Sequence, residues 1–228
     1  MKKVILFDLD DTLAPEDDFI RSGYAETARY LKDRYFPGYD EEKIKEELYA
    51  LYKESPRFVF NRYLEGKNTA YTGEDIKELI RIYREHEPSV SYYDDVMPSL
   101  KELKELGFKL GIITDGFVIS QRNKLKALDA FSFFDRIIIT GELGEGYGKP
   151  DERPFIMMKE AFCAELSDLV YVGDNPEKDF YIGKDKEIST IRIYRKGSVY
   201  ENAGYREDIR EDIRIGSFDE LLSAVKRL

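Results

Sequence analysis

Hydrophobic residues change their spacing twice along this 228-residue chain. The chain opens with an unbroken apolar run, Val4–Phe7, which is typical of a strand buried on both faces of a parallel sheet. From residue 15 to about residue 92, apolar positions recur three and four apart, which indicates amphipathic helices. From residue 93 onward, short apolar runs alternate with helical patterns. This order predicts an α/β core made of residues 1–14 and 93–228, with a helical insert at residues 15–92.

Two helices of the insert can be placed by their apolar stripes and their N-terminal caps. One is expected over Glu41–Lys53 after Asp40, and the other over Glu74–His86 after Thr72. Asp and Thr side chains accept hydrogen bonds from the free amides of a first helical turn, so both residues are predicted N-caps. The insert lacks strand-like alternation and is therefore expected to be helical throughout.

The remainder of the chain predicts a doubly wound parallel sheet, because strands and helices alternate along it. The later strands are expected at Phe108–Thr114, Ile137–Thr140, Leu169–Val172 and Thr190–Tyr194, with a short edge strand at Ile213–Ile215. The helices are expected at Pro98–Leu106, Ile119–Leu128, Pro154–Ala164 and Phe218–Leu228.

Four of the predicted strands end in, or run shortly before, side chains that can take part in chemistry. Asp8 and Asp10 follow the first strand, and Thr114, Lys149 and Asp174 follow later ones. Because the carboxyl ends of parallel strands meet at one edge of a sheet, these side chains are expected to gather there. Two acids as close as Asp8 and Asp10 are costly unless a cation or a proton neutralises them. An acidic cluster taken alone would also fit a polar turn, but four sets in this order favour a functional site.

This combination of side chains fits the transfer of a phosphoryl group. Carboxylates hold Mg²⁺, which prefers oxygen ligands, while a hydroxyl and a lysine contact the phosphate oxygens. A remaining carboxylate can act as nucleophile or as general acid and base.

The chain resembles the haloacid dehalogenase-like (HAD) hydrolases, in the phosphatase branch with a helical cap inserted after the first strand. The resemblance covers nearly the whole chain and implies a Rossmann-like HAD core. It rests on four motifs in the family's order: Asp8-Leu9-Asp10-Asp11-Thr12, then Thr114, then Lys149 before Pro150, then Gly173-Asp174 with Asp179.

The resemblance implies distinct roles for the first two acids. Asp8 would be the nucleophile that forms an aspartyl-phosphate, and it would also ligate Mg²⁺. Asp10 would be the general acid and base, and its main-chain carbonyl would be a metal ligand. The family's dehalogenases lack this second acid, because a halide needs no proton to leave, so Asp10 favours phosphate chemistry.

The other motifs imply the phosphate and metal contacts. Thr114, with the backbone amides of Asp115 and Gly116, would bind the phosphoryl oxygens, and Lys149 would bring a positive charge to the phosphoryl group and to Asp8. Asp174 would be the third protein ligand of the metal. Beyond the direct ligands, Asp179 would orient a metal-bound water or Lys149, and Asn175 would join the surroundings of the metal.

Composition narrows the partners and the compartment. A net charge of -10 and the lack of a basic tract argue against nucleic acid as a partner. The first apolar run is interrupted by Asp8 too early for a signal peptide, and other apolar runs are too short to span a membrane. A lone Cys163 excludes an intrachain disulfide, so we expect a cytoplasmic protein. Cys163 is expected to be a small core residue, and His86, the single histidine, to be solvated.

Three interpretations of function remain open from the sequence. The leading one is a Mg²⁺-dependent phosphatase of a small phosphorylated metabolite. The alternatives are a phosphomutase of the same fold and a catalytically silent binding module. The sequence leaves the substrate and the oligomeric state open, since sugar phosphates, nucleoside monophosphates and phosphoglycolate all suit a cap of this size. Among the basic residues of the insert, Arg57 and Arg62 are the better candidates for a substrate contact.

Overall fold

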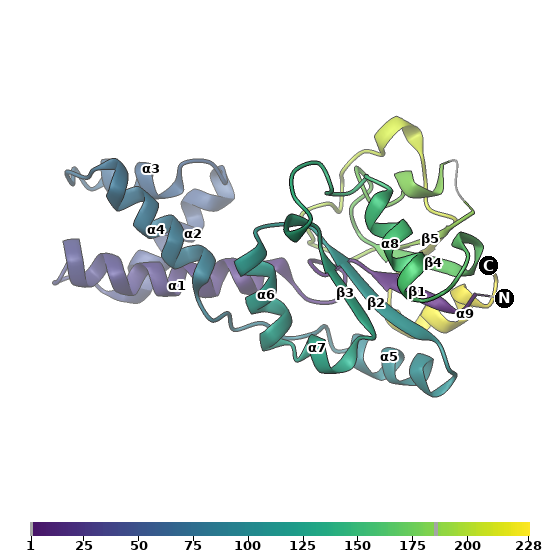
Figure 1. Cartoon of the computed structure of the whole chain (residues 1–228). Coiled ribbons are helices and arrows are strands. Elements are labelled where there is room, and N and C mark those ends of the chain that lie inside the picture. The colour runs from purple at the N-terminus through teal and green to yellow at the C-terminus, as the bar shows by residue number, and fades with distance from the viewer. Residues whose placement is uncertain (1, 185–186) are drawn as a thin grey trace. The chain divides into compact units, whose positions relative to one another are not determined.

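The computed structural model describes residues 2–184 and 187–228 (Figure 1). The chain divides into two compact units, which are described separately here. One comprises the residues up to Pro15 together with Ser91–Leu228, and the other comprises Glu16–Val90. The first unit is α/β and the second is helical.

A parallel sheet organises the α/β unit. Its strands run in the order β3-β2-β1-β4-β5-β6, and each neighbouring pair is parallel. This arrangement confirms the predicted fold class, including the short edge strand. The strands are β1 (Val4–Phe7), β2 (Lys109–Thr114), β3 (Arg136–Ile139), β4 (Leu169–Gly173), β5 (Ser189–Ile193) and β6 (Ile213–Ile215).

The helices of this unit follow the predicted sequence of elements with small shifts at their ends. The helix expected at Phe218–Leu228 is shorter, because it opens with a 3₁₀ turn. The short α7 was not predicted, since four residues carry too little periodicity to stand out. The helices are α5 (Val96–Glu105), α6 (Val118–Ala127), α7 (Ala130–Phe133), α8 (Arg153–Ala161) and α9 (Leu221–Val225), with 3₁₀ turns at η1 (Thr140–Glu142), η2 (Leu166–Asp168), η3 (Tyr181–Gly183), η4 (Arg206–Asp208) and η5 (Phe218–Glu220).

Both faces of the sheet are covered, which explains the continuous apolar runs of its strands. On one face lies α8 (Figure 1). Its Phe155 and Met158 pack into a buried cluster with Leu6 and Tyr171. On the other face, the ring of Phe7 stacks on that of Phe218 with the centroids 5.9 Å apart. The inner strands are therefore packed on both sides.

The helical unit contains α1 (Glu16–Tyr35), α2 (Glu41–Glu54), α3 (Val59–Gly66) and α4 (Gly73–Glu85). Both predicted caps are confirmed. Asp40 accepts a hydrogen bond from the amide of Glu42, and Thr72 forms a capping box with Asp75. No strand occurs among the residues described for this unit. Its core is rich in aromatic side chains: Tyr24, Phe36, Phe60 and Tyr63 are buried in it.

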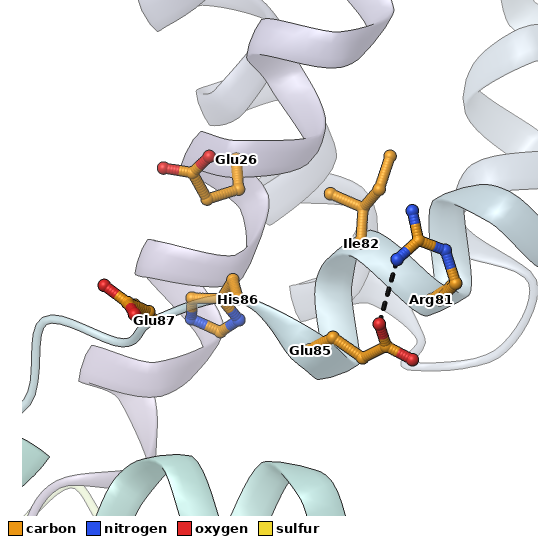
Figure 2. A pocket seen from close by; sticks show the side chains of 6 residues that line it. All are labelled: Glu26, Arg81, Ile82, Glu85, His86 and Glu87. Atoms are coloured by element: carbon orange, nitrogen blue, oxygen red, sulfur yellow. Dashed lines mark hydrogen bonds and ion pairs between the residues drawn. The ribbon is translucent and has the colours of Figure 1, made fainter. Parts of the chain in front are cut away.

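His86 corrects one expectation, because it is buried rather than solvated. Its ring nitrogens lie 2.8 Å from the Ser22 hydroxyl and 2.7 Å from the carbonyl oxygen of Tyr83. The ring also packs on Phe19 with the centroids 4.7 Å apart. His86 borders a hollow of about 410 Å³, whose other lining residues are Glu26, Arg81, Ile82, Glu85 and Glu87 (Figure 2). The histidine therefore ties the end of α4 to α1.

The single cysteine corrects a second expectation. Cys163, expected in the core, is exposed just beyond α8 and has a left-handed backbone with φ of 49°. Its burial was wrongly predicted because the helix ends before it.

No helix in the described part of the chain is long and apolar enough to cross a membrane.

Candidate active site

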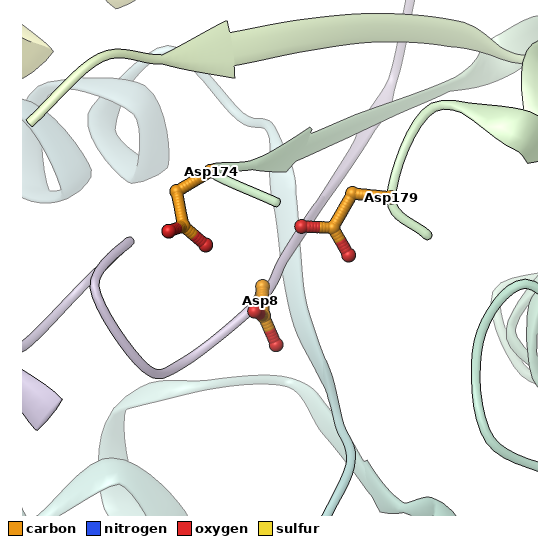
Figure 3. Close-up of side chains that lie close together, drawn as sticks. All are labelled: Asp8, Asp174 and Asp179. Carbon is orange, nitrogen blue, oxygen red and sulfur yellow. The ribbon is translucent and has the colours of Figure 1, made fainter. Parts of the chain in front are cut away.

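Three carboxylates meet at the carboxyl ends of the two central strands. Asp8 follows β1 and Asp174 follows β4, and these strands are hydrogen-bonded neighbours. The amide of Asp8 donates to the carbonyl of Val172 over 2.9 Å, which fixes the end of β1 against β4. Asp8, Asp174 and Asp179 each place an oxygen within 4.8 Å of the others' (Figure 3).

Burial and mutual repulsion make this cluster electrostatically costly. Burial, opposed by Lys149, raises the pKa of Asp8 to about 6. Burial and the neighbouring charges of Asp179 and Asp8 raise the pKa of Asp174 to about 9. Holding these carboxylates together as charged groups is therefore unfavourable, and a cation bound among them would relieve the repulsion.

The ammonium of Lys149 occupies the centre of the charged cluster. Its Nζ lies 2.7 Å from Asp8 Oδ1, 2.9 Å from Asp179 Oδ1 and 2.6 Å from the Tyr171 hydroxyl. Burial acts to lower the pKa of Lys149, but the attraction of Asp179 and Asp8 outweighs it and holds the pKa well above its usual value. Lys149 is therefore a permanent positive charge beside the Asp8 carboxylate.

Asp179 reaches this lysine because residue 173 is a glycine. A Cβ at Gly173 would lie 2.4 Å from Asp179 Oδ2, which no side chain can tolerate. Asp179 Oδ2 also accepts a hydrogen bond from the amide of Asn175 over 2.9 Å. Both oxygens of Asp179 therefore already have donors, whereas Asp174 Oδ2 is buried without a partner among the described residues. Asn175 contributes by shaping the turn, since its own side-chain oxygen accepts from the amide of Glu177.

Thr114 and Asp115 follow β2, but their side chains differ in their surroundings. The Thr114 hydroxyl is buried and finds no hydrogen-bond partner within the described residues. Such an orphaned donor is costly and fits a polar group of a bound ligand. The Asp115 carboxylate instead accepts hydrogen bonds from Thr140, from the Lys149 amide and from Lys178. The side chain of Asp115 thus braces the loop that carries Lys149, while the phosphate contact of its backbone amide stays a prediction.

Gly116 completes this turn with a φ of 139°, and a Cβ there would lie 2.9 Å from the side-chain nitrogen Nε2 of Gln121. The same Nε2 of Gln121 donates to Asp10 Oδ2 over 2.9 Å and to the main-chain carbonyl of Asp115 over 2.6 Å. Lys124, one helical turn further along α6, lies 2.7 Å from Asp10 Oδ1. The side chain of Asp10 is therefore held by α6 and lies outside the cluster of three carboxylates.

Four residues that touch the predicted site were missed at the sequence level. Each lies inside a helix, a strand or a turn, where a side chain is ordinarily expected to pack in the core or to lie at the surface. Lys124 and Gln121 lie three residues apart on the predicted helix, a spacing that puts them on one face and could have signalled a shared contact. The four are Gln121, Lys124, Tyr171 and Lys178.

The donor set fits a hard divalent cation. The atoms that meet are carboxylate oxygens, the type that Mg²⁺ prefers, and one oxygen of Asp174 is buried with no hydrogen-bond partner in the described part of the chain. Asp8 and Asp174 are the two side chains best placed to hold such an ion, because both oxygens of Asp179 are engaged elsewhere.

The comparison with known proteins agrees with this geometry. A family model described as haloacid dehalogenase-like hydrolase matches residues 5–193. A glyceraldehyde 3-phosphate phosphatase of Methanopyrus kandleri is 30% identical, covering 100% of this chain and 99% of the relative. A protein of the same name from Methanocaldococcus jannaschii is 32% identical, with the same coverage. Among solved structures, an HAD phosphatase from Thermococcus onnurineus is 25% identical with a TM-score of 0.61, covering 99% of this chain and 98% of that one.

The chain belongs to the haloacid dehalogenase-like hydrolase family, as its motifs indicated. Within that family the protein is a phosphatase, a hydrolase related over its full length to phosphatases.

Proposed function

We propose that the protein is a Mg²⁺-dependent phosphatase that hydrolyses a small phosphate monoester through an aspartyl-phosphate on Asp8. The observation that carries the proposal is the contact of Lys149 with Asp8 beside the unpartnered oxygen of Asp174. A nucleophile, a fixed positive charge and a carboxylate oxygen able to ligate a metal, all at one sheet edge, are what this chemistry requires.

In the first step, an oxygen of Asp8 attacks phosphorus and the bond from phosphorus to the ester oxygen breaks. Asp10 gives its proton to that leaving oxygen, which departs as an alcohol. Lys149 holds Asp8 Oδ1 at 2.7 Å and orients the carboxylate for the attack. The Thr114 hydroxyl donates to a phosphoryl oxygen, which satisfies the orphaned group.

In the second step, a water molecule attacks phosphorus of the aspartyl-phosphate. Asp10 takes a proton from this water, the bond from phosphorus to Asp8 breaks, and inorganic phosphate leaves with Asp8 restored. Asp10 can serve both steps only if its carboxylate moves away from Lys124 and Gln121, which hold both of its oxygens in this structure.

Mg²⁺, bound by Asp8 and Asp174 with the main-chain carbonyl of Asp10, would supply charge neutralisation at the phosphoryl oxygens. Lys149 adds a charge that is independent of the metal, and Asp179 keeps that charge in place. Asp115, which follows β2, accepts a hydrogen bond from the Lys149 amide and so holds the backbone of Lys149 in place.

Glyceraldehyde 3-phosphate is the first substrate to test, because two full-length relatives carry its name. It is small, anionic and soluble, which suits a cytoplasmic metabolite phosphatase. The helical unit would act as the cap that selects the substrate. Within that unit, the guanidinium of Arg62 donates to the carbonyl of Leu51 over 2.6 Å, so Arg57 is the freer candidate for a substrate contact.

Phosphate release from p-nitrophenyl phosphate and from glyceraldehyde 3-phosphate, with Mg²⁺ and with EDTA, tests the proposal. We expect turnover with Mg²⁺, loss with EDTA and recovery when Mg²⁺ is returned. Turnover unaffected by EDTA would exclude the metal, and no turnover of any phosphorylated metabolite would favour a silent module. Stimulation by an added sugar bisphosphate, with phosphoryl transfer to a sugar rather than to water, would favour a phosphomutase.

A further inference from the structure

Tyr171 brings a phenol hydroxyl into the charged cluster from the hydrophobic core. It lies in β4, two residues before Gly173, and its side chain is fully buried. Its hydroxyl lies 2.6 Å from Lys149 Nζ and 3.4 Å from Asp179 Oδ1. A tyrosine in an apolar strand would ordinarily be a packing residue, but this one reaches a proposed catalytic group.

The ammonium of Lys149 has three N–H donors and three acceptors around it. These acceptors are Tyr171, Asp8 and Asp179, at 2.6, 2.7 and 2.9 Å. Asp8 is the one acceptor that reacts, because its oxygen bonds to phosphorus during turnover. Tyr171 and Asp179 stay unchanged throughout and therefore fix the position of Lys149.

The two fixed acceptors differ in kind. Asp179 carries a charge that attracts the ammonium, whereas Tyr171 accepts a hydrogen bond and leaves the positive charge available to Asp8 and to a phosphoryl group. A third carboxylate there would draw the ammonium away from Asp8. A phenylalanine would leave one N–H donor buried without a partner, which costs free energy and lets Lys149 shift.

Core packing decides where the hydroxyl of Tyr171 lies. The ring of Phe155, from α8, meets the Tyr171 ring edge-on with the centroids 5.0 Å apart. Both rings belong to the buried cluster that includes Leu6 and Met158. The phenol therefore has little freedom to move, and the geometry of Lys149 is set by the packing of α8 on the sheet.

We infer that Tyr171 is a positioning residue for the phosphatase reaction, acting through Lys149. The inference rests on the proposed function, because it assumes that Lys149 acts on the transferring phosphoryl group. Lys149 matters most when charge develops on that group, so misplacing it should lower kcat more than it changes KM.

Tyr171→Phe tests the inference, because it removes one hydroxyl and keeps the ring. With p-nitrophenyl phosphate and saturating Mg²⁺, kcat should fall by roughly 10- to 100-fold, as small misplacements of catalytic groups commonly cost, with KM nearly unchanged. The inhibition constant of orthovanadate, which mimics five-coordinate phosphorus, should rise in parallel, and that of inorganic phosphate should change little. The matched control is Tyr63→Phe, which removes a buried hydroxyl of the helical unit and should leave kcat unchanged.

A double-mutant cycle separates positioning from general packing. Added to Lys149→Ala, Tyr171→Phe should have no further effect, because the residue through which Tyr171 acts is gone. If Tyr171→Phe fails to fold, Phe155→Leu replaces it, because it loosens the packing around the Tyr171 ring. This variant should also lower kcat, and it should do so only when Lys149 is present. A wild-type kcat in Tyr171→Phe, or an equal loss in the Lys149→Ala background, would overturn the inference while the phosphatase stands. An inactive wild-type protein would overturn the proposed function and this inference with it.

Discussion

The two compact units of this protein place their charges in opposite ways. The α/β unit buries Asp8, Asp174 and Lys149 together at the ends of its central strands. The helical unit has ion pairs that lie in water, such as Lys77 with Glu74, whose side chains are 73% and 81% exposed. Its core is filled instead by aromatic and aliphatic side chains.

The buried charges of the α/β unit mark it as the unit that carries the proposed chemistry, whereas the helical unit is held together by ordinary core packing. Burying like charges raises the free energy of the folded protein, and an exposed pair contributes little either way. The cluster of Asp8, Asp174 and Asp179 carries this cost, and the raised pKa values of Asp8 and Asp174 are characteristic of a reactive site. The following changes test the contrast between the two units.

The largest effect is expected from Asp8→Asn in the α/β unit. Removing a catalytic nucleophile should lower kcat by about 10⁴-fold or more. The fold should persist, because the substitution also removes one of three mutually repelling carboxylates. Phosphate release and thermal unfolding measured on the same sample check both halves, and near wild-type turnover would remove Asp8 from its role.

Asp10→Asn should also be severely impaired, by roughly 10²–10⁴-fold, as the loss of a general acid and base usually costs. The loss should be smaller for p-nitrophenyl phosphate than for an alkyl phosphate, because p-nitrophenolate leaves without a proton. Steady-state rates on the two substrates provide the comparison. An equally steep fall on both would argue against protonation of the leaving oxygen by Asp10.

In the helical unit, Leu48→Ala should affect stability rather than chemistry. Leu48 is fully buried in the core of that unit, and such truncations cost about 2–5 kcal/mol. Urea unfolding should show the loss, while kcat on p-nitrophenyl phosphate at low temperature stays near that of the wild type. A collapse of kcat in protein that remains folded would contradict the division of labour.

Asp95→Asn probes a charge in the α/β unit that serves structure. Both Asp95 oxygens accept from the Arg195 guanidinium, at 2.8 and 2.9 Å, and one also accepts from the Phe218 amide. Burial acts to raise the pKa of Asp95, but these donors outweigh it and hold the pKa below its usual value. The substitution should cost about 1–3 kcal/mol, the usual range when a polar group shielded from water loses its partner.

The sign of the pH effect follows from that lowered pKa. The unfolded chain has a pKa for this group of about 3.9, so the stabilisation is complete above that pH and is lost as pH falls through the lower folded value. Urea unfolding from neutral pH to about pH 3 should show a shallower acid loss in Asp95→Asn than in the wild type. Identical slopes would mean that other acids carry the dependence.

The smallest effect is expected from Lys77→Ala, which breaks the exposed pair with Glu74. Surface pairs of this kind contribute little to stability, so the midpoint of urea unfolding should hardly move. Turnover should be unchanged. A large shift would show that the charges of the helical unit matter more than their exposure indicates.

The sequence was informative wherever one local signal decides a structure. The continuous apolar runs predicted the inner strands within a residue or two, and Asp40 and Thr72 marked the starts of their helices. Local signals failed where an element ends. Cys163 was placed in a helix that stops short of it, and His86 was placed in water because sequence spacing does not show that Ser22 and Phe19 lie beside it.

The order of its motifs, by itself, determined the family of this protein and the residue types of its site. Parallel strands bring their carboxyl ends together, so Asp8, Lys149 and Asp174 had to meet once the sheet was recognised. Tertiary structure alone decided which partner each of them has. Tyr171, from inside an apolar strand, contacts Lys149. Lys124 and Gln121, from a helix far along the chain, hold Asp10. Such contacts depend on packing between distant segments, whereas the strand ends depend on backbone pairing that a short run of residues already specifies.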